Sequence, residues 1–118
     1  MRGRLDQPAT PEVSAAEAEA LIIDGAYLLD VRELDEWEAG RAPLANHIPL
    51  GVLGSRLEEL PKDKKIVVVC RSGGRSGVAT DALVQSGFDA LNLAGGMQAW
   101  AETGREVLTE DEAPGVVI

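Results

Sequence analysis

A single cysteine, Cys70, is followed by six residues whose types suit anion chemistry. The segment, called here the Cys70 loop, consists of Cys70, Arg71, Ser72, Gly73, Gly74, Arg75 and Ser76. The glycines permit backbone conformations in which successive amides turn toward one point, and the serines add hydroxyl donors. Inward amides, two guanidinium groups and the amino terminus of a following helix all lower the pKa of a thiol. The sequence therefore predicts a nucleophilic thiolate at Cys70, with residues 71–76 as its anion-binding loop.

A cysteine after a run of valines is most often an inert buried residue when nothing else marks it. The composition of the loop argues against that interpretation. An ordinary strand-to-helix connection needs no special residues, whereas this one holds two glycines, two arginines and two serines. We therefore treat residues 70–76 as the candidate site.

The residues on both sides of the Cys70 loop predict a strand, a tight turn and a helix. Ile66–Val69 is a β-branched run typical of a buried central strand in a parallel sheet. We expect a helix over residues 77–84, with Ser76 as its amino-terminal cap. Cys70 then lies at the carboxyl end of a strand, which is the usual place for ligands on such sheets.

Strands and helices alternate along the rest of the chain. A capping box at Ser14 begins a helix that ends before Gly25, and Trp100 is expected to anchor a later helix in the core. Further strands are expected over residues 27–31, 46–48 and 90–93, and further helices over residues 34–39 and 53–60. This alternation predicts an α/β fold with a parallel sheet.

Four segments in register resemble the rhodanese domain, a sulfurtransferase module. The matching segments are Asp30–Glu33, Gly40–Leu50, Cys70–Ser76 and Leu93–Trp100. The resemblance covers about residues 12–104, nearly a whole domain. It implies a rhodanese-like fold, with a central parallel sheet flanked by helices on both faces. It also implies that Asp30 and Arg32 organise the rim beside the Cys70 loop without forming bonds to a substrate.

Two positions depart from the family pattern. Arg41 occupies a place where the family commonly has histidine, and the only histidine, His47, falls where the family often has asparagine. A Cys–His pair is conceivable. The resemblance favours activation of the cysteine by loop amides and charge, so we interpret His47 as a structural or rim residue. Glu36 or Glu38 is a plausible partner for Arg32.

The resemblance implies transfer of sulfane sulfur through a persulfide on Cys70, without a cofactor. The thiolate attacks the outer sulfur of a small anionic donor such as thiosulfate, and Arg71 or Arg75 balances the charge of the departing sulfite. A thiol or a protein cysteine then accepts the sulfur, with cyanide as the acceptor in vitro. Only sulfur forms and releases an S–S bond readily at neutral pH, so the chemistry requires cysteine.

Two alternatives stay open. The domain could serve as a persulfide carrier or regulatory module with little turnover. It could also be a phosphatase or arsenate reductase, a class that uses a similar loop. That class places an arginine six residues after its nucleophile, where this chain has Ser76.

Length and composition limit the remaining function classes. A chain of 118 residues can form one domain with a core that needs neither disulfide nor metal, and one Cys and one His lack the spacing of a metal site. The net charge of -9 opposes binding to nucleic acid and to anionic membranes. No apolar run approaches membrane-spanning length and no signal peptide is evident, so we expect a cytoplasmic protein.

We divide the chain into a flexible leader over residues 1–11, a rhodanese-like domain over residues 12–105 and an acidic tail over residues 106–118. The last residues of the tail, Val116–Ile118, either pack as an extra strand or stay loose.

Overall fold

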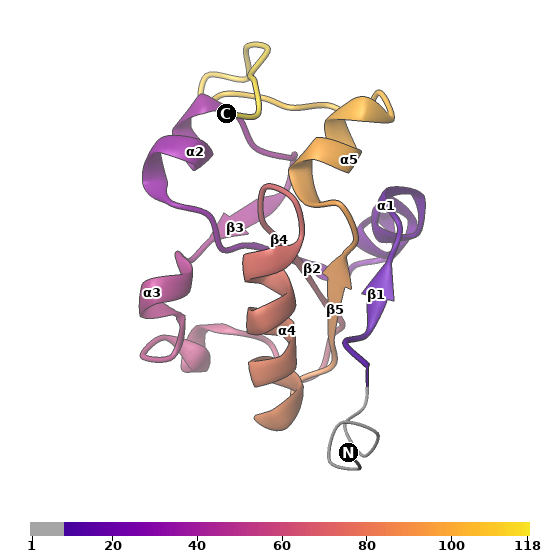
Figure 1. Cartoon of the computed structure of the whole chain (residues 1–118), viewed down its shortest axis with the longest axis vertical. Coiled ribbons are helices and arrows are strands. Elements are labelled where there is room, and N and C mark those ends of the chain that lie inside the picture. Colours follow the sequence, from indigo (N-terminus) through magenta and orange to yellow (C-terminus); the bar gives the residue numbers. More distant parts are fainter. Residues whose placement is uncertain (1–8) are drawn as a thin grey trace, which may run out of the picture.

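The computed structural model describes residues 9–118, and the predicted leader lies outside them except for residues 9–11. Five parallel strands form one sheet in the order β1-β5-β4-β2-β3 (Figure 1). The strands are β1 Glu12–Val13, β2 Tyr27–Asp30, β3 Ala45–His47, β4 Ile66–Val69 and β5 Ala90–Leu93. The predicted α/β class with a central parallel sheet is confirmed. The edge strand β1 was not predicted, because two residues carry no alternating pattern.

Helices connect the strands and cover both faces of the sheet. They are α1 Ala15–Ile23, α2 Leu34–Ala39, α3 Leu50–Leu53, α4 Gly74–Gln85 and α5 Gly96–Glu102. The predicted helix over residues 53–60 is wrong, because α3 ends at Leu53 and a separate 3-10 turn covers Leu57–Glu59. Between them the Ser55 hydroxyl donates to the Val52 carbonyl oxygen at 2.9 Å, a local bond that favours a turn over a continued helix.

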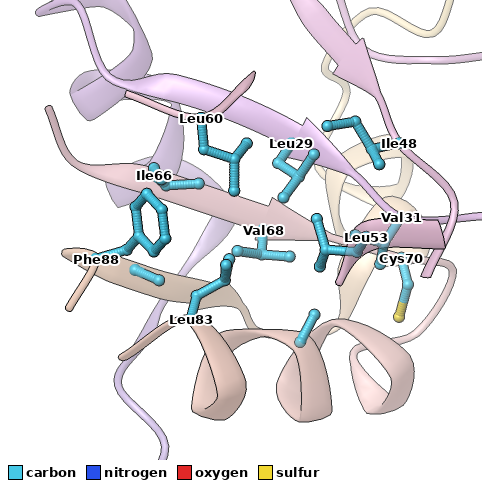
Figure 2. Packing of buried hydrophobic residues seen from close by; sticks show 12 residues of the cluster. Leu29, Val31, Ile48, Leu53, Leu60, Ile66, Val68, Cys70, Leu83 and Phe88 are labelled. Carbon is cyan, nitrogen blue, oxygen red and sulfur yellow. The ribbon is translucent and has the colours of Figure 1, made fainter. Parts of the chain in front are cut away.

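The core consists of two apolar clusters separated by the sheet. Alternate residues of β4 serve opposite faces, with Ile66 and Val68 in one cluster and Val67 and Val69 in the other. The first cluster packs against α3 and α4, and Figure 2 shows it with Cys70 at one end. The second cluster packs against α1 and α5 and contains Trp100, which is buried as predicted.

Helix α4 begins three residues earlier than predicted. Its cap is Gly73, in the left-handed region with φ of 110°, so the prediction of Ser76 as the cap is wrong. A left-handed residue suits glycine, and it lets the chain turn directly from the end of β4 into the helix. Ser76 instead lies in the first turn of α4 with its side chain buried.

The segment of residues 106–118 packs against the end of α2 (Figure 1). Arg41 and Leu108 form an antiparallel bridge, and the Val116 N–H donates to the Ala39 carbonyl oxygen at 2.9 Å. Val107 and Val117 contact the second apolar cluster. The segment is therefore ordered against the domain, yet it adds no strand to the sheet.

Among the described residues, no helix is both long enough and apolar enough to cross a membrane.

Candidate active site

Cys70 follows the last residue of β4, and its side chain is almost completely enclosed, with 1% of the residue exposed. Its Sγ accepts hydrogen bonds from the Gly73 N–H at 3.1 Å and from the Ser76 hydroxyl at 3.2 Å. The structure thus folds the predicted loop around the sulfur. Ser72 and Gly74 lie on the exposed side of the same loop.

The pKa of the Cys70 thiol lies below its ordinary value as the net result of opposing effects. Burial raises the pKa, since it disfavours the charged thiolate, but hydrogen bonds lower it by more. The donors are the Ser76 hydroxyl and the backbone N–H groups of Ser76, Gly73 and Ser72. The loop therefore favours a thiolate mainly through hydrogen bonds.

The two arginines of the loop are held in different ways. Arg75 forms two hydrogen bonds with the Glu36 carboxylate of α2, at 2.7 and 2.8 Å. This pair lowers the pKa of Glu36 to about 2 and raises the pKa of Arg75 above its ordinary range. Arg71 is exposed, and its Nε donates to the backbone oxygen of Ile118 at 2.9 Å. When the Gln98 side-chain amide is oriented with its oxygen toward Arg71, that oxygen accepts a hydrogen bond from the guanidinium at 3.0 Å.

Asp30 and Arg32 form an ion pair that lies inside the protein, with both side chains fully buried. Arg32 Nε lies 3.0 Å from Asp30 Oδ1, and Nη2 donates to Asp30 Oδ2 and to the Gly40 carbonyl oxygen, both at 2.8 Å. The predicted pairing of Arg32 with Glu36 or Glu38 is therefore wrong. The nearer carboxylate, two residues before Arg32 on the end of β2, takes the guanidinium, and this leaves Glu36 for Arg75.

His47 belongs to a stack of side chains and forms no bond to Cys70. Its Nε2 donates to the Arg32 carbonyl oxygen at 2.7 Å. Its ring stacks on Trp37 with the centroids 4.8 Å apart, and the Arg41 guanidinium lies 4.4 Å from the Trp37 ring centroid. The structure therefore agrees with a structural role for His47 and does not form the Cys–His pair.

The first turn of α5 packs against the Cys70 loop and donates two backbone hydrogen bonds to it. The N–H groups of Met97 and Gln98 donate to the carbonyl oxygens of Cys70 and Arg71, at 2.8 and 2.9 Å. This approach requires Gly96, because a Cβ there would lie 2.5 Å from the Cys70 carbonyl oxygen. These hydrogen bonds therefore join the segment that follows β4 to the segment that follows β5.

Residue types alone did not single out Asn92, Glu12 and Gly96 as parts of this site. One signal was present, since Asn92 is a polar residue inside the apolar strand Ala90–Leu93. Its buried side chain contacts Ser76, as described below. Among the described residues, no three His, Cys, Asp or Glu side chains come together as metal ligands.

The fold and the site together define a single α/β domain that presents one cysteine in an amide-rich loop. A family model described as the rhodanese-like domain matches residues 14–103, so the chain belongs to the rhodanese-like domain family. The resemblance found in the sequence is thus confirmed.

Individual relatives agree with this assignment. The chain is 46% identical over 74 residues to a putative sulfurtransferase, YtwF, of Bacillus subtilis, which covers 63% of this chain and 72% of that protein. It is 39% identical over 74 residues to the putative sulfur carrier protein YrkF of the same organism, covering 62% and 40% of the two chains. A rhodanese-related protein of Thermoplasma volcanium superimposes with a TM-score of 0.80 and 34% identity, over 85% of this chain and 99% of that one.

Proposed function

We propose that this protein transfers sulfane sulfur through a persulfide on Cys70. The observation that carries the proposal is the pair of hydrogen bonds on Sγ, from the Gly73 N–H and the Ser76 hydroxyl. These donors favour a sulfur anion at the end of β4, first as the thiolate and then as the persulfide. Donors that already point at the sulfur, such as the Gly73 N–H, stabilise negative charge as it forms there.

The reaction has two displacement steps at sulfur. In the first, the Cys70 thiolate attacks the outer sulfur of thiosulfate, the donor's S–S bond breaks, and sulfite leaves with the bonding electron pair. Cys70 then carries one extra sulfur as an anionic persulfide. In the second, an acceptor thiolate attacks that outer sulfur, and Cys70 leaves as the thiolate. With cyanide as the acceptor, the product is thiocyanate.

We assign the binding of the anionic donor chiefly to the loop amides and to Arg71. The positive charge of Arg75 is already balanced by the Glu36 carboxylate. No side-chain carboxylate pairs with Arg71 in the part of the chain that the structure describes. We propose a thiol or a protein cysteine as the natural acceptor.

A second candidate function is that of a persulfide carrier with little turnover on small molecules. The relative named as a putative sulfur carrier favours it. The phosphatase or arsenate reductase alternative has less support. Its signature arginine is replaced by Ser76, which is buried against the sulfur.

Intact mass spectrometry tests the proposal directly. Incubation with thiosulfate is expected to add the mass of one sulfur atom, and cyanide is expected to remove it as thiocyanate appears. The Cys70→Ser variant, which keeps a side chain of similar size, is expected to fold and to gain no mass. A wild-type protein that gains no sulfur contradicts the proposal, as does a variant that still transfers it. A stable persulfide that forms without catalytic turnover to cyanide or thiols identifies the carrier.

A further inference from the structure

Ser76 lies between the reactive sulfur and a buried amide. Its hydroxyl oxygen is 3.2 Å from Cys70 Sγ and 2.6 Å from Asn92 Oδ1 on β5. A serine hydroxyl has a single proton, so it donates to one of these two acceptors at a time. The shorter distance goes to the amide, which makes Asn92 the stronger competitor while the cysteine is a neutral thiol.

The orientation of the Asn92 amide is fixed from behind. Its Nδ2 donates to the Glu12 carboxylate on β1 at 3.0 Å and to the Gly73 carbonyl oxygen at 3.2 Å. Both partners are acceptors, so a flipped amide would set oxygen against oxygen at both contacts. Oδ1 must therefore face Ser76. The pairing of β1 with β5, in which Glu12 lies opposite Asn92, provides this anchor.

Packing does not explain Asn92, since its neighbours along the strand are apolar and its side chain is buried. A buried amide costs free energy unless its polar atoms have partners, and here the oxygen and both amide protons have them. Two of the three go to residues of the Cys70 loop. This pattern indicates a role toward the loop.

We propose that the Ser76 proton is shared between Cys70 and Asn92, and that Asn92 is a positioning residue which sets the proton affinity of the thiol. While Cys70 is protonated, the Ser76 hydroxyl donates to Asn92. When the thiol ionises, the hydroxyl turns to the sulfur and leaves Oδ1 without a donor. Losing that buried bond opposes ionisation, so Asn92 holds the pKa of Cys70 above the value that an unshared serine would give.

The proposed function explains why such a control of the Cys70 pKa would be useful, but the proton sharing itself does not depend on it. A thiolate with a very low pKa is a weaker nucleophile, and the best attacking thiol has a pKa near the ambient pH. Burial raises the pKa of Cys70, and the hydrogen-bond donors of the loop lower it. The contact of Asn92 with Ser76 adds an adjustment of this pKa that leaves the backbone N–H donors to the sulfur in place.

The test is a pH titration of the Cys70 thiol by its ultraviolet thiolate absorbance. Cys70 is the only cysteine, so subtracting the spectrum of the matching Cys70→Ser protein isolates one group. Asn92→Val is the main variant, because valine fits a buried strand but offers no acceptor. We expect its thiol pKa to fall by about one unit, and that of Ser76→Ala to rise by about one unit. In the double variant, which combines Asn92→Val with Ser76→Ala, the thiol pKa is expected to equal that of Ser76→Ala alone.

The direction of the pKa change in Asn92→Val, together with the result for the double variant, separates this role from a structural one. If Asn92 only stiffened the loop, its loss would raise the pKa or act equally with and without Ser76, and either result overturns the proposal. The charged groups of the loop and of the elements packed on it are the same in the Asn92 and Ser76 variants; they are Arg71, Arg75, Glu36, the Asp30–Arg32 pair and Glu12, which contacts the Asn92 amide.

A second pair of variants covers the case in which Asn92→Val does not fold. Glu12 is exposed at the sheet edge, so Glu12→Ala and Glu12→Gln are both expected to fold. Both remove the charge, but only Gln still accepts from Asn92. A lower thiol pKa in Glu12→Ala than in Glu12→Gln supports the proposal, and equal values contradict it. The titration needs no sulfur donor, so it stays informative even if the protein transfers no sulfur.

Discussion

Arg71 and Arg75 lie in one short loop, but their charges are not equally available. Arg75 is bound in a two-point contact with Glu36, and that geometry is among the stronger ion pairs proteins form. Arg71 is exposed and contacts an amide and a backbone oxygen. At the scale of the single residue, we therefore propose Arg71, rather than Arg75, as the guanidinium that binds an anionic donor.

We expect Arg71→Ala to raise the KM for thiosulfate by about tenfold with a smaller change in kcat, because a charge-assisted contact to the donor is lost. Steady-state turnover of thiosulfate and cyanide measures both constants. Lys65→Ala is the control, since Lys65 precedes β4 and lies at the opposite end of that strand. An Arg71 variant that keeps the wild-type KM removes this residue from donor binding.

Two of the elements hold the Cys70 loop by different means. Helix α2 contacts the loop through one ion pair, between Glu36 and Arg75. Helix α5 contacts it through two backbone hydrogen bonds that require close approach. The ion pair depends on pH, whereas the backbone hydrogen bonds have no titrating group and depend on the close approach of α5 to the loop.

The ion pair between α2 and α4 predicts a pH-dependent term in stability. The pKa of Glu36 is about 2 in the folded protein against a usual 4.5, so the carboxylate stabilises the fold above pH 4.5. This term is lost as the pH falls from about 4.5 to about 2. We expect Glu36→Gln to lower the free energy of unfolding by about 1 kcal/mol at pH 7, a value reduced for the partial exposure of Arg75.

Urea unfolding at several pH values checks this expectation. The difference between wild type and Glu36→Gln should vanish near pH 2. Asp35→Asn, on the same helix and exposed, serves as the matched control and should change stability by less than about 0.5 kcal/mol. A constant difference at all pH values argues against ionisation of Glu36 as its source.

The contact of α5 with the loop predicts a strong effect at Gly96. A Cβ there would lie 2.5 Å from the Cys70 carbonyl oxygen and 2.6 Å from the Arg71 carbonyl carbon, and φ is 59°. We expect Gly96→Ala to destabilise the fold by about 3 kcal/mol through clash and backbone strain, and to slow persulfide formation. Thermal unfolding and intact mass measure the two effects. In Gly51→Ala, where a Cβ meets nothing within 4 Å, neither effect should appear.

On the scale of the whole molecule, the parallel sheet brings segments that are distant in the sequence together near the carboxyl ends of its strands. The strand order sets β4 between β2 and β5, so the ends that carry Asp30, Cys70 and Asn92 are neighbours. The segment of residues 106–118 lies at the same end of the molecule as α2 (Figure 1). Its backbone oxygen at Ile118 contacts Arg71, so this segment reaches the site itself.

Close packing at Gly40 attaches that segment. A Cβ at Gly40 would lie 2.6 Å from both Val107 Cγ1 and the Val116 carbonyl oxygen, while its φ of 169° is open to any residue. We expect Gly40→Ala to release the segment, with at least about tenfold faster hydrogen exchange at the Val116 N–H. Gly54→Ala, which meets nothing within 4 Å, is the control. Unchanged exchange at Val116 contradicts this account of the attachment.

The sequence alone determined the parallel α/β fold and singled out Cys70 as the candidate nucleophile. The β-branched run of β4 and the glycines after Cys70 report local backbone preferences, which act over a few residues and can be recognised in a short segment. For the same reason the bounds of β4, β5 and α2 agree with the prediction.

Tertiary structure alone decided which side chains meet. Arg32 had carboxylates at several spacings to choose from, and only the burial of β2 selects Asp30 and leaves Glu36 for Arg75. Asn92 meets Ser76 because β5 lies beside β4, a neighbour relation that no local pattern encodes. Hydrogen bonds and ion pairs act over a few ångströms in space, so the partners that come from distant segments, Glu36 for Arg75 and Asn92 for Ser76, depend on the fold and not on spacing along the chain.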